Sequence, residues 1–118
     1  MITLEDFKKV EMVVGKILSA EKIPETDKLL KLSVDLAEEK PRQIISGIAP
    51  YFPDCSVLVG KKCMFVANLE PRVIRGFESQ GMVLAVLAEG ARLNEPFGQD
   101  KFSLLEPNED IPAGTRAR

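Results

Sequence analysis

The stretch Leu29–Leu36, LLKLSVDL, alternates between apolar and polar side chains. Successive side chains of a β-strand point to opposite faces, so this pattern predicts a strand with one buried and one solvated face. The buried face would carry Leu30, Leu32, Val34 and Leu36, and the solvated face Lys31, Ser33 and Asp35.

Strand and turn signals continue on both sides of this stretch. MVVGKILSAEKI, residues 12–23, is rich in β-branched residues and predicts a long strand that bends or bulges at Gly15. Turns are expected at Pro24–Asp27 and at residues 37–41. The other predicted strands are RQIISGI (42–48), KKCMFVANL (61–69), SQGMVLAVL (79–87) and a short late one, FSLLEP (102–107).

A short helix is expected ahead of the first strand. Thr3 and Asp6 have the spacing of a capping box, in which each side chain accepts a hydrogen bond from the backbone of the other. Leu4, Phe7 and Val10 then share one face of the helix, which we expect to lie on the core.

Short strands at even spacing, joined by turns, indicate a small barrel or sandwich. Five main strands, with an irregular link over residues 49–60 and a polar loop over residues 88–100, favour the barrel. We therefore predict an all-β protein, a five-stranded OB-fold barrel with a short N-terminal helix and a C-terminal extension. Residues 1–118 are expected to form a single domain, with the barrel over about residues 10–106.

The composition is that of an ordinary globular protein. Of 118 residues, 45% are apolar and 29% charged, and no apolar run is long enough to span a bilayer. The N-terminus lacks the apolar region of a signal peptide, so we expect a cytoplasmic protein with no membrane partner. Cys55 and Cys63 are expected to be reduced thiols rather than a disulfide.

The absence of histidine argues against an enzyme. Histidine is the commonest general base near neutral pH and the commonest metal ligand, and the chain contains none. The carboxylates are scattered rather than paired. We expect no catalytic residues, no cofactor and no metal.

The charge distribution differs from the net charge. A net charge of −2 argues against a nucleic-acid ligand, because such proteins normally carry a basic surface. Residues 61–80, however, hold four basic and two acidic side chains, whereas residues 81–118 hold six acids and four bases. Positive charge is therefore concentrated around Asn68–Met82, NLEPRVIRGFESQGM.

Arg72 and Arg75 are the leading candidate ligands in this stretch. We expect them in a turn between two strands, where guanidinium groups can hold phosphate oxygens by paired hydrogen bonds. The alternative is a solvated turn with surface ion pairs to Glu70 or Glu78.

Other candidates flank the two arginines. Asn68, Ser79 and Gln80 could donate hydrogen bonds to phosphate, ribose or base edges, or could only cap turns. Met82 fits the core better than a contact, although it would lie at the edge of a binding cleft. Three further cations could extend the basic surface or only solvate it: Lys28, Lys31 and Arg42.

Five segments of the chain are KVEMVVGKI, DKLLKLSVD, QIISGI, VANLEPRVIRG and SQGMVLAV. In this order and spacing they resemble the tRNA-binding domain attached to many methionyl-tRNA synthetases. The domain is also similar to stand-alone structure-specific tRNA-binding proteins and to the endothelial-monocyte-activating polypeptide. One departure is Val13, where the family often has arginine, so Val13 is not a candidate ligand.

The resemblance implies an OB barrel that binds tRNA through shape and backbone, with no chemistry of its own. It also implies a homodimer joined through the flanking segments Leu4–Val10 and Phe102–Arg118, acting alone or in trans to an aminoacyl-tRNA synthetase. A related branch of the fold resembles export-related chaperones, so a peptide-binding protein is the alternative. Aromatic residues are scarce, with Phe77 alone in the basic stretch and Phe65 expected in the core, which favours a folded tRNA over an unstructured strand.

Overall fold

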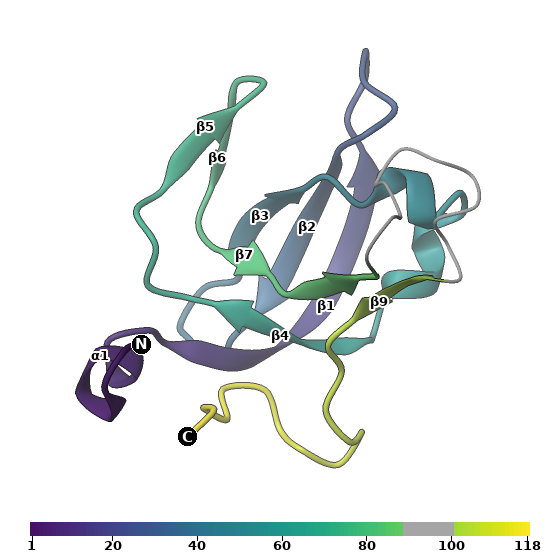
Figure 1. Ribbon diagram of the computed structural model, residues 1–118. Coiled ribbons are helices and arrows are strands. Elements are labelled where there is room, and N and C mark those ends of the chain that lie inside the picture. Colours follow the sequence, from purple (N-terminus) through teal and green to yellow (C-terminus); the bar gives the residue numbers. More distant parts are fainter. Residues whose placement is uncertain (89–100) are drawn as a thin grey trace.

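The computed structural model describes residues 1–88 and 101–118, and its centre is a five-stranded antiparallel sheet that curls into a nearly closed barrel (Figure 1). The strand order is β3-β2-β1-β4-β7. The strands are β1 (Met12–Lys22), β2 (Leu30–Asp35), β3 (Arg42–Ser46), β4 (Lys62–Val66) and β7 (Met82–Val83). The predicted all-β, OB-type barrel is thus confirmed. The polar loop predicted for residues 88–100 lies outside the described residues, Ala88 excepted.

The two faces of β2 follow the alternation of apolar and polar residues in its sequence. Leu30, Leu32 and Val34 are fully buried inside the barrel, and the polar residues between them are half-buried on the outer face. Phe65 of β4 is also fully buried, as expected. Burial of these side chains therefore fixes the register of the central strands, because a slip of one residue would point the apolar side chains toward solvent.

β1 is long enough to pair with two neighbours. Its first half pairs with β4 and its second half with β2, and the register with β2 shifts between Ile17 and Ser19. Of the bend or bulge predicted at Gly15, the bulge is therefore wrong in position, because the irregularity lies between Ile17 and Ser19. Gly15 is needed for packing instead, since a Cβ atom there would lie 2.7 Å from side-chain atoms of Val34, Leu36 and Phe65.

The irregular link between the third and fourth predicted strands contains two 3-10 helices, η1 (Ala49–Tyr51) and η2 (Cys55–Leu58). Leu58, at the end of η2, is fully buried. Cys55 and Cys63 are separate thiols, as predicted.

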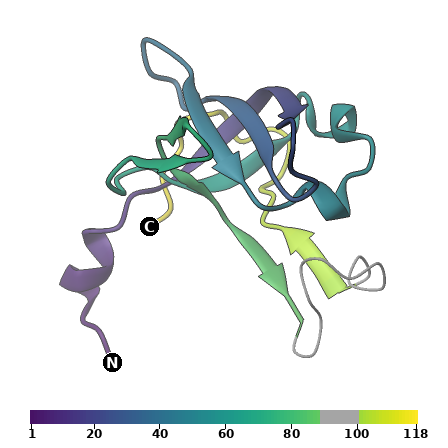
Figure 2. The same ribbon diagram turned by 90° about the horizontal axis from the view of Figure 1, so that it is seen from above.

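The strand predicted over residues 79–87 is divided. Met82–Val83 form β7 on the barrel, whereas β8 (Ala85–Leu87) leaves it and pairs with β9 (Phe102–Leu104) (Figure 2). After β9 the chain returns under the barrel. There the backbone of residues 114–117 forms hydrogen bonds of 2.7–2.8 Å with Met12 and Val14 of β1.

The helix α1 (Leu4–Lys8) has the predicted capping box between Thr3 and Asp6. The expected packing on the core is wrong, because no residue of α1 is buried and Leu4 is 65% exposed. α1 stands away from the barrel (Figures 1 and 2). Within residues 1–88 and 101–118, no helix has the length and apolar character needed to cross a membrane.

Candidate nucleic-acid interface

The arginine-bearing stretch folds as a β-hairpin rather than the expected turn. β5 (Arg72–Ile74) pairs with β6 (Phe77–Ser79), and only Arg75 and Gly76 form the connection. Their φ angles are 54° and 84°, which is the geometry of a two-residue type I′ hairpin turn. Arg75 thus lies at the hairpin tip, and Arg72 lies on a strand.

The register of the hairpin divides its side chains between two faces. Arg72 lies opposite Ser79, and Val73 lies opposite Glu78. Ser79 is buried against the barrel, whereas Val73 is 72% exposed. Arg72 is therefore on the face that looks toward the barrel. The Lys31 ammonium lies 5.1 Å from the centre of the Phe77 ring and links this hairpin to β2.

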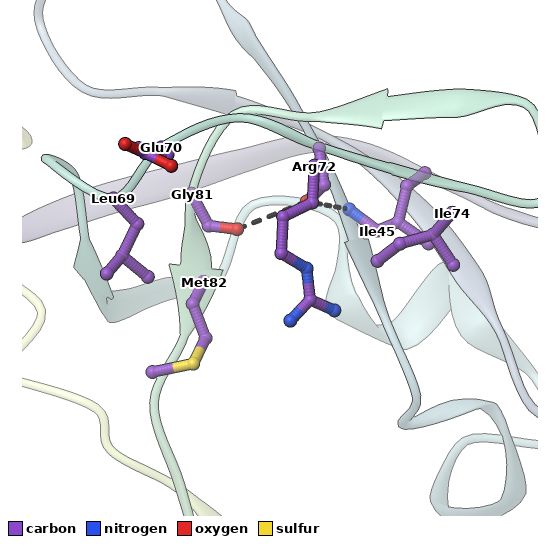
Figure 3. A pocket seen from close by; sticks show the side chains of 8 residues that line it. Ile45, Leu69, Glu70, Arg72, Ile74, Gly81 and Met82 are labelled. Carbon is purple, nitrogen blue, oxygen red and sulfur yellow. Dashed lines mark hydrogen bonds between the residues drawn. The ribbon is translucent and has the colours of Figure 1, made fainter.

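Between the hairpin and the barrel is an open groove of about 420 Å³, here called the hairpin groove (Figure 3). Most of its wall is aliphatic or thioether surface, and the Arg72 guanidinium projects into it beside Met82. Of the predicted site residues, the groove brings together Arg72, Ser79 and Met82. Its complete lining is Ile45, Leu69, Glu70, Arg72, Ile74, Ser79, Gly81 and Met82.

Arg72 and Arg75 are the two arginines of the hairpin. Neither guanidinium has an ion pair or hydrogen bond with any residue in the described ranges, 1–88 and 101–118. The alternative ion pairs to Glu70 or Glu78 are therefore absent from that part of the chain. Both arginines remain predicted ligands, each with a complete set of donors available.

Ser79 and Gln80 have a structural task that was not foreseen. The Ser79 Oγ accepts a hydrogen bond from the Ile45 backbone N–H at 3.0 Å, and the Gln80 Oε1 accepts one from the Gln43 N–H, also at 3.0 Å. The Gln80 N–H in turn donates to the Gln43 carbonyl at 2.8 Å. These bonds satisfy the outer edge of β3 and close the barrel toward β7.

Arg42 forms hydrogen bonds within the protein. Its guanidinium makes a bidentate ion pair with Glu38, with N–O distances of 2.7 and 2.8 Å, and donates to the carbonyls of Ala67 and Gln80. The hydrogen bonds between Arg42 and Glu38 raise the pKa of Arg42 and lower the pKa of Glu38. Arg42 therefore has little capacity left for an external anion.

Asn68 links the N-terminal segment to the end of β4 by two hydrogen bonds. Its Oδ1 accepts from the Glu11 N–H at 2.8 Å, and its Nδ2 donates to the Lys9 carbonyl at 2.6 Å. The two partners lie far from Asn68 in the sequence, so this is neither the proposed ligand contact nor a local turn cap.

The remaining candidates are at the surface. Met82 is 45% exposed, so its expected place in the core is wrong. Lys31 is on the solvated face of β2, as predicted, and pairs with Glu21 at 3.5 Å. Lys28 is exposed in the connection before β2.

Three apolar groove residues were missed as candidates: Ile45, Leu69 and Ile74. A signal for Ile74 was available, because VIRGF places Val73 and Ile74 before, and Phe77 after, a possible two-residue turn at Arg-Gly. Such a hairpin places Arg72 and Ile74 on one face. For Ile45 no sequence signal exists, since the groove forms only when residues 45 and 79 meet.

The fold and the site define a class. An OB-type barrel with an open surface groove, and with two arginines beside it that have no partner among the described residues, has the architecture of a binding protein. The family described as a tRNA binding domain matches residues 12–116. The chain belongs to this tRNA-binding domain family, and its 118 residues contain no synthetase catalytic domain.

The relatives of this chain include methionine–tRNA ligases. The ligase of Lactococcus lactis is 40% identical over 115 residues, which is 97% of this chain and 16% of the ligase. The ligase of Methanospirillum hungatei is 46% identical over 117 residues, 99% of this chain and 16% of the ligase. The chain thus spans about a sixth of the length of these curated relatives.

Two solved structures match almost over their whole length. The MetRS-related protein from Pyrococcus horikoshii has a TM-score of 0.81 at 40% identity, covering 100% of this chain and 98% of that one. The chaperone CsaA from Bacillus anthracis has a TM-score of 0.80 at 26% identity, covering 100% and 99%.

Proposed function

We propose that this chain binds tRNA through the β5–β6 hairpin and the hairpin groove, without catalysis. The observation that carries the proposal is the pair of unpaired arginines on one hairpin. Membership of the tRNA-binding domain family supports the choice of ligand. Arg75 at the tip and Arg72 in the groove hold phosphates, and Lys28 and Lys31 add positive charge beside them.

The other predicted ligands act indirectly in this proposal. Ser79, Gln80 and Arg42 hold the hairpin and the link to β7 in place, and Asn68 fixes the segment that leads to the groove. These bonds fix the backbone that carries the two arginines, and a surface with fixed positions of positive charge suits recognition of the shape of a folded RNA.

Titration of the chain with bulk tRNA at several salt concentrations tests the proposal. Each phosphate contact contributes about −0.7 to −0.9 to the slope of log affinity against log salt, so Arg72→Gln and Arg75→Asn should each flatten the slope by nearly one unit. Asn is chosen at position 75 because it tolerates the positive φ of 54° there.

The control is Lys22→Gln, which removes one exposed charge at the end of β1 and should change the slope little. Double-stranded DNA serves as a second ligand, to separate tRNA recognition from general attraction. If wild type fails to bind tRNA at micromolar concentration in low salt, the proposed function is wrong.

A second candidate function is binding of unfolded peptide segments. The apolar wall of the hairpin groove and the similarity to the chaperone CsaA from Bacillus anthracis favour it. Pull-down of a reduced, carboxymethylated polypeptide, with tRNA as competitor, separates the two candidates. Peptide capture that tRNA does not displace would support the chaperone function.

We also propose a cytoplasmic homodimer that works alone or in trans to a methionyl-tRNA synthetase, with residues 1–118 as one domain. The identities to methionine–tRNA ligases support the link to the synthetase. For the dimer, the supporting observation is the exposed apolar surface of Ile2, Leu4 and Val10 around α1.

A further inference from the structure

The hairpin groove has a chemical composition that neither a phosphate nor an apolar side chain would match. Leu69 and Met82 are 47% and 45% exposed in its wall, and the Arg72 guanidinium lies between aliphatic neighbours (Figure 3). A long arginine side chain normally reaches water or an anion with its charged end. The strand register places the Arg72 side chain on the inner face of the hairpin, where it is exposed to solvent and has the apolar wall of the groove beside it.

An apolar side chain in the groove would cover this guanidinium without giving it a partner, which costs free energy. An isolated phosphate would pair with the guanidinium but leave the apolar wall in water. A nucleotide supplies both missing parts, because its base is a flat ring and its phosphate is an anion.

We propose that the hairpin groove takes one unstacked nucleobase of the RNA, packed between Met82, Leu69 and the guanidinium plane of Arg72. Bases stack on arginine planes as they do on aromatic rings, and the polarizable methionine sulfur packs well on ring systems. This inference rests on the proposed function and adds to it a base-binding subsite.

The polar side chains of the groove are Glu70, Arg72 and Ser79, and Ser79 has no free donor for the edge of a base, which favours contact with the ring face. The Ser79 hydroxyl accepts from the Ile45 N–H and donates to the Gly81 carbonyl at 3.1 Å, so its donor is already used. Ser79 is also buried. The subsite therefore accepts different bases and locates an extruded nucleotide, a feature of RNA shape rather than of sequence.

Methyl NMR of the full chain tests this subsite directly. The chain has four methionines, so Met82 can be observed beside Met1, Met12 and Met64 as internal references, with its signal assigned from Met82→Leu. The probe is a single-stranded RNA tetramer of adenosines, compared with a tetramer of the same sugar–phosphate length without bases.

A stacked base shifts the signal of a methyl group beneath it to higher field. We expect this shift at Met82 with the adenosine tetramer only, together with a loss of affinity of about 5-fold or more for the tetramer in Met82→Ala. Val73→Ala, on the outer face of the same hairpin, should keep wild-type affinity. Thermal unfolding checks that both variants remain folded.

Three outcomes would overturn the inference. They are equal affinity for the two tetramers, no shift at Met82 with the adenosine tetramer, and a shift at Met82 with a carboxymethylated unfolded polypeptide but not with RNA. Filter binding of bulk tRNA to the same samples keeps this result apart from the proposed function. If wild type binds tRNA but shows no Met82 shift with the adenosine tetramer, only the subsite is wrong. If wild type does not bind tRNA, the proposed function is wrong.

Discussion

At the scale of single residues, Arg42 connects three separate parts of the chain. Its donors reach Glu38 before β3, Ala67 after β4 and Gln80 before β7. Only a planar guanidinium can supply these hydrogen bonds together, because a lysine ammonium is a single point of charge. The charge of Arg42 therefore matters less than the shape of its side chain.

We expect Arg42→Lys to lower the free energy of unfolding by about 2 kcal/mol, since hydrogen bonds from the charged donor are lost. Urea denaturation measures this change. The matched control is Arg75→Lys, at an unpaired guanidinium, where the free energy should not change. Equal effects of the two substitutions would contradict the structural role of Arg42.

The ion pair also gives an acid dependence. Because Arg42 lowers the pKa of Glu38 in the folded chain, the stabilisation is present above the ordinary value of 4.5 and is lost as the pH falls below it. In Glu38→Gln this part of the acid dependence should disappear. Urea denaturation from pH 6 down to pH 3 compares the variant with wild type.

Cys63 and Cys55 should differ in reactivity. Burial raises the pKa of the Cys63 thiol to about 11, whereas Cys55 is half-buried. At pH 8 we expect iodoacetamide to modify Cys55 much faster, because the thiolate is the nucleophile. Mass spectrometry of the digested chain identifies the modified residue. Stability that depends on Cys63 is lost as the pH rises from 9.0 towards 11.

Much of the candidate site could not be predicted from its individual residues in the sequence. Ser79, Gln80 and Asn68 were singled out as polar residues beside the arginines, but their partners Ile45, Gln43 and Lys9 lie 34 to 59 positions away. A local pattern cannot show such pairings. It therefore marked the right segment and did not distinguish its free side chains from its occupied ones.

At the scale of elements, the success of a prediction depended on where its information lay. β2 was predicted correctly because its alternation is contained in consecutive residues. The β5–β6 hairpin was missed because Arg75 is an uncommon residue for a turn that needs positive φ. The bulge in β1 was misplaced because Gly15 serves close packing, which depends on β2 and β4.

Gly15→Ala tests that explanation. A Cβ atom would approach three side chains at 2.7 Å, so we expect a loss of about 1–3 kcal/mol in the free energy of unfolding. The control is Gly47→Ala, where a Cβ would meet nothing within 4 Å. Urea denaturation measures the free energy of unfolding of both variants. A loss at Gly47 as large as at Gly15 would point to backbone flexibility rather than to crowding.

At the scale of the whole molecule, α1 lies away from the β5–β6 hairpin (Figure 1), and no apolar residue around α1 lines the hairpin groove. A dimer formed through α1 and the C-terminal segment would leave both grooves open. Two grooves held in one particle would bind one large RNA more tightly than either alone, if the spacing fits.

Leu4→Asp should convert the proposed dimer to a monomer, because Leu4 is 65% exposed in the chain and the substitution would put a charge in the interface. Size-exclusion chromatography with light scattering measures the mass. Val57→Asp, at a side chain 53% exposed on η2, is the control and should leave the mass unchanged. A monomeric wild type would remove the dimer proposal.

The closure of the barrel has a consequence for aggregation. An unprotected edge strand can pair with the edge of another molecule and start a fibre. In this chain the outward N–H groups of β3 at Gln43 and Ile45 are bonded to the side chains of Gln80 and Ser79. The Gln80 and Ser79 side chains thus protect this strand edge. Until they have formed these hydrogen bonds, the edge of β3 in a newly made chain is open to pairing with another molecule.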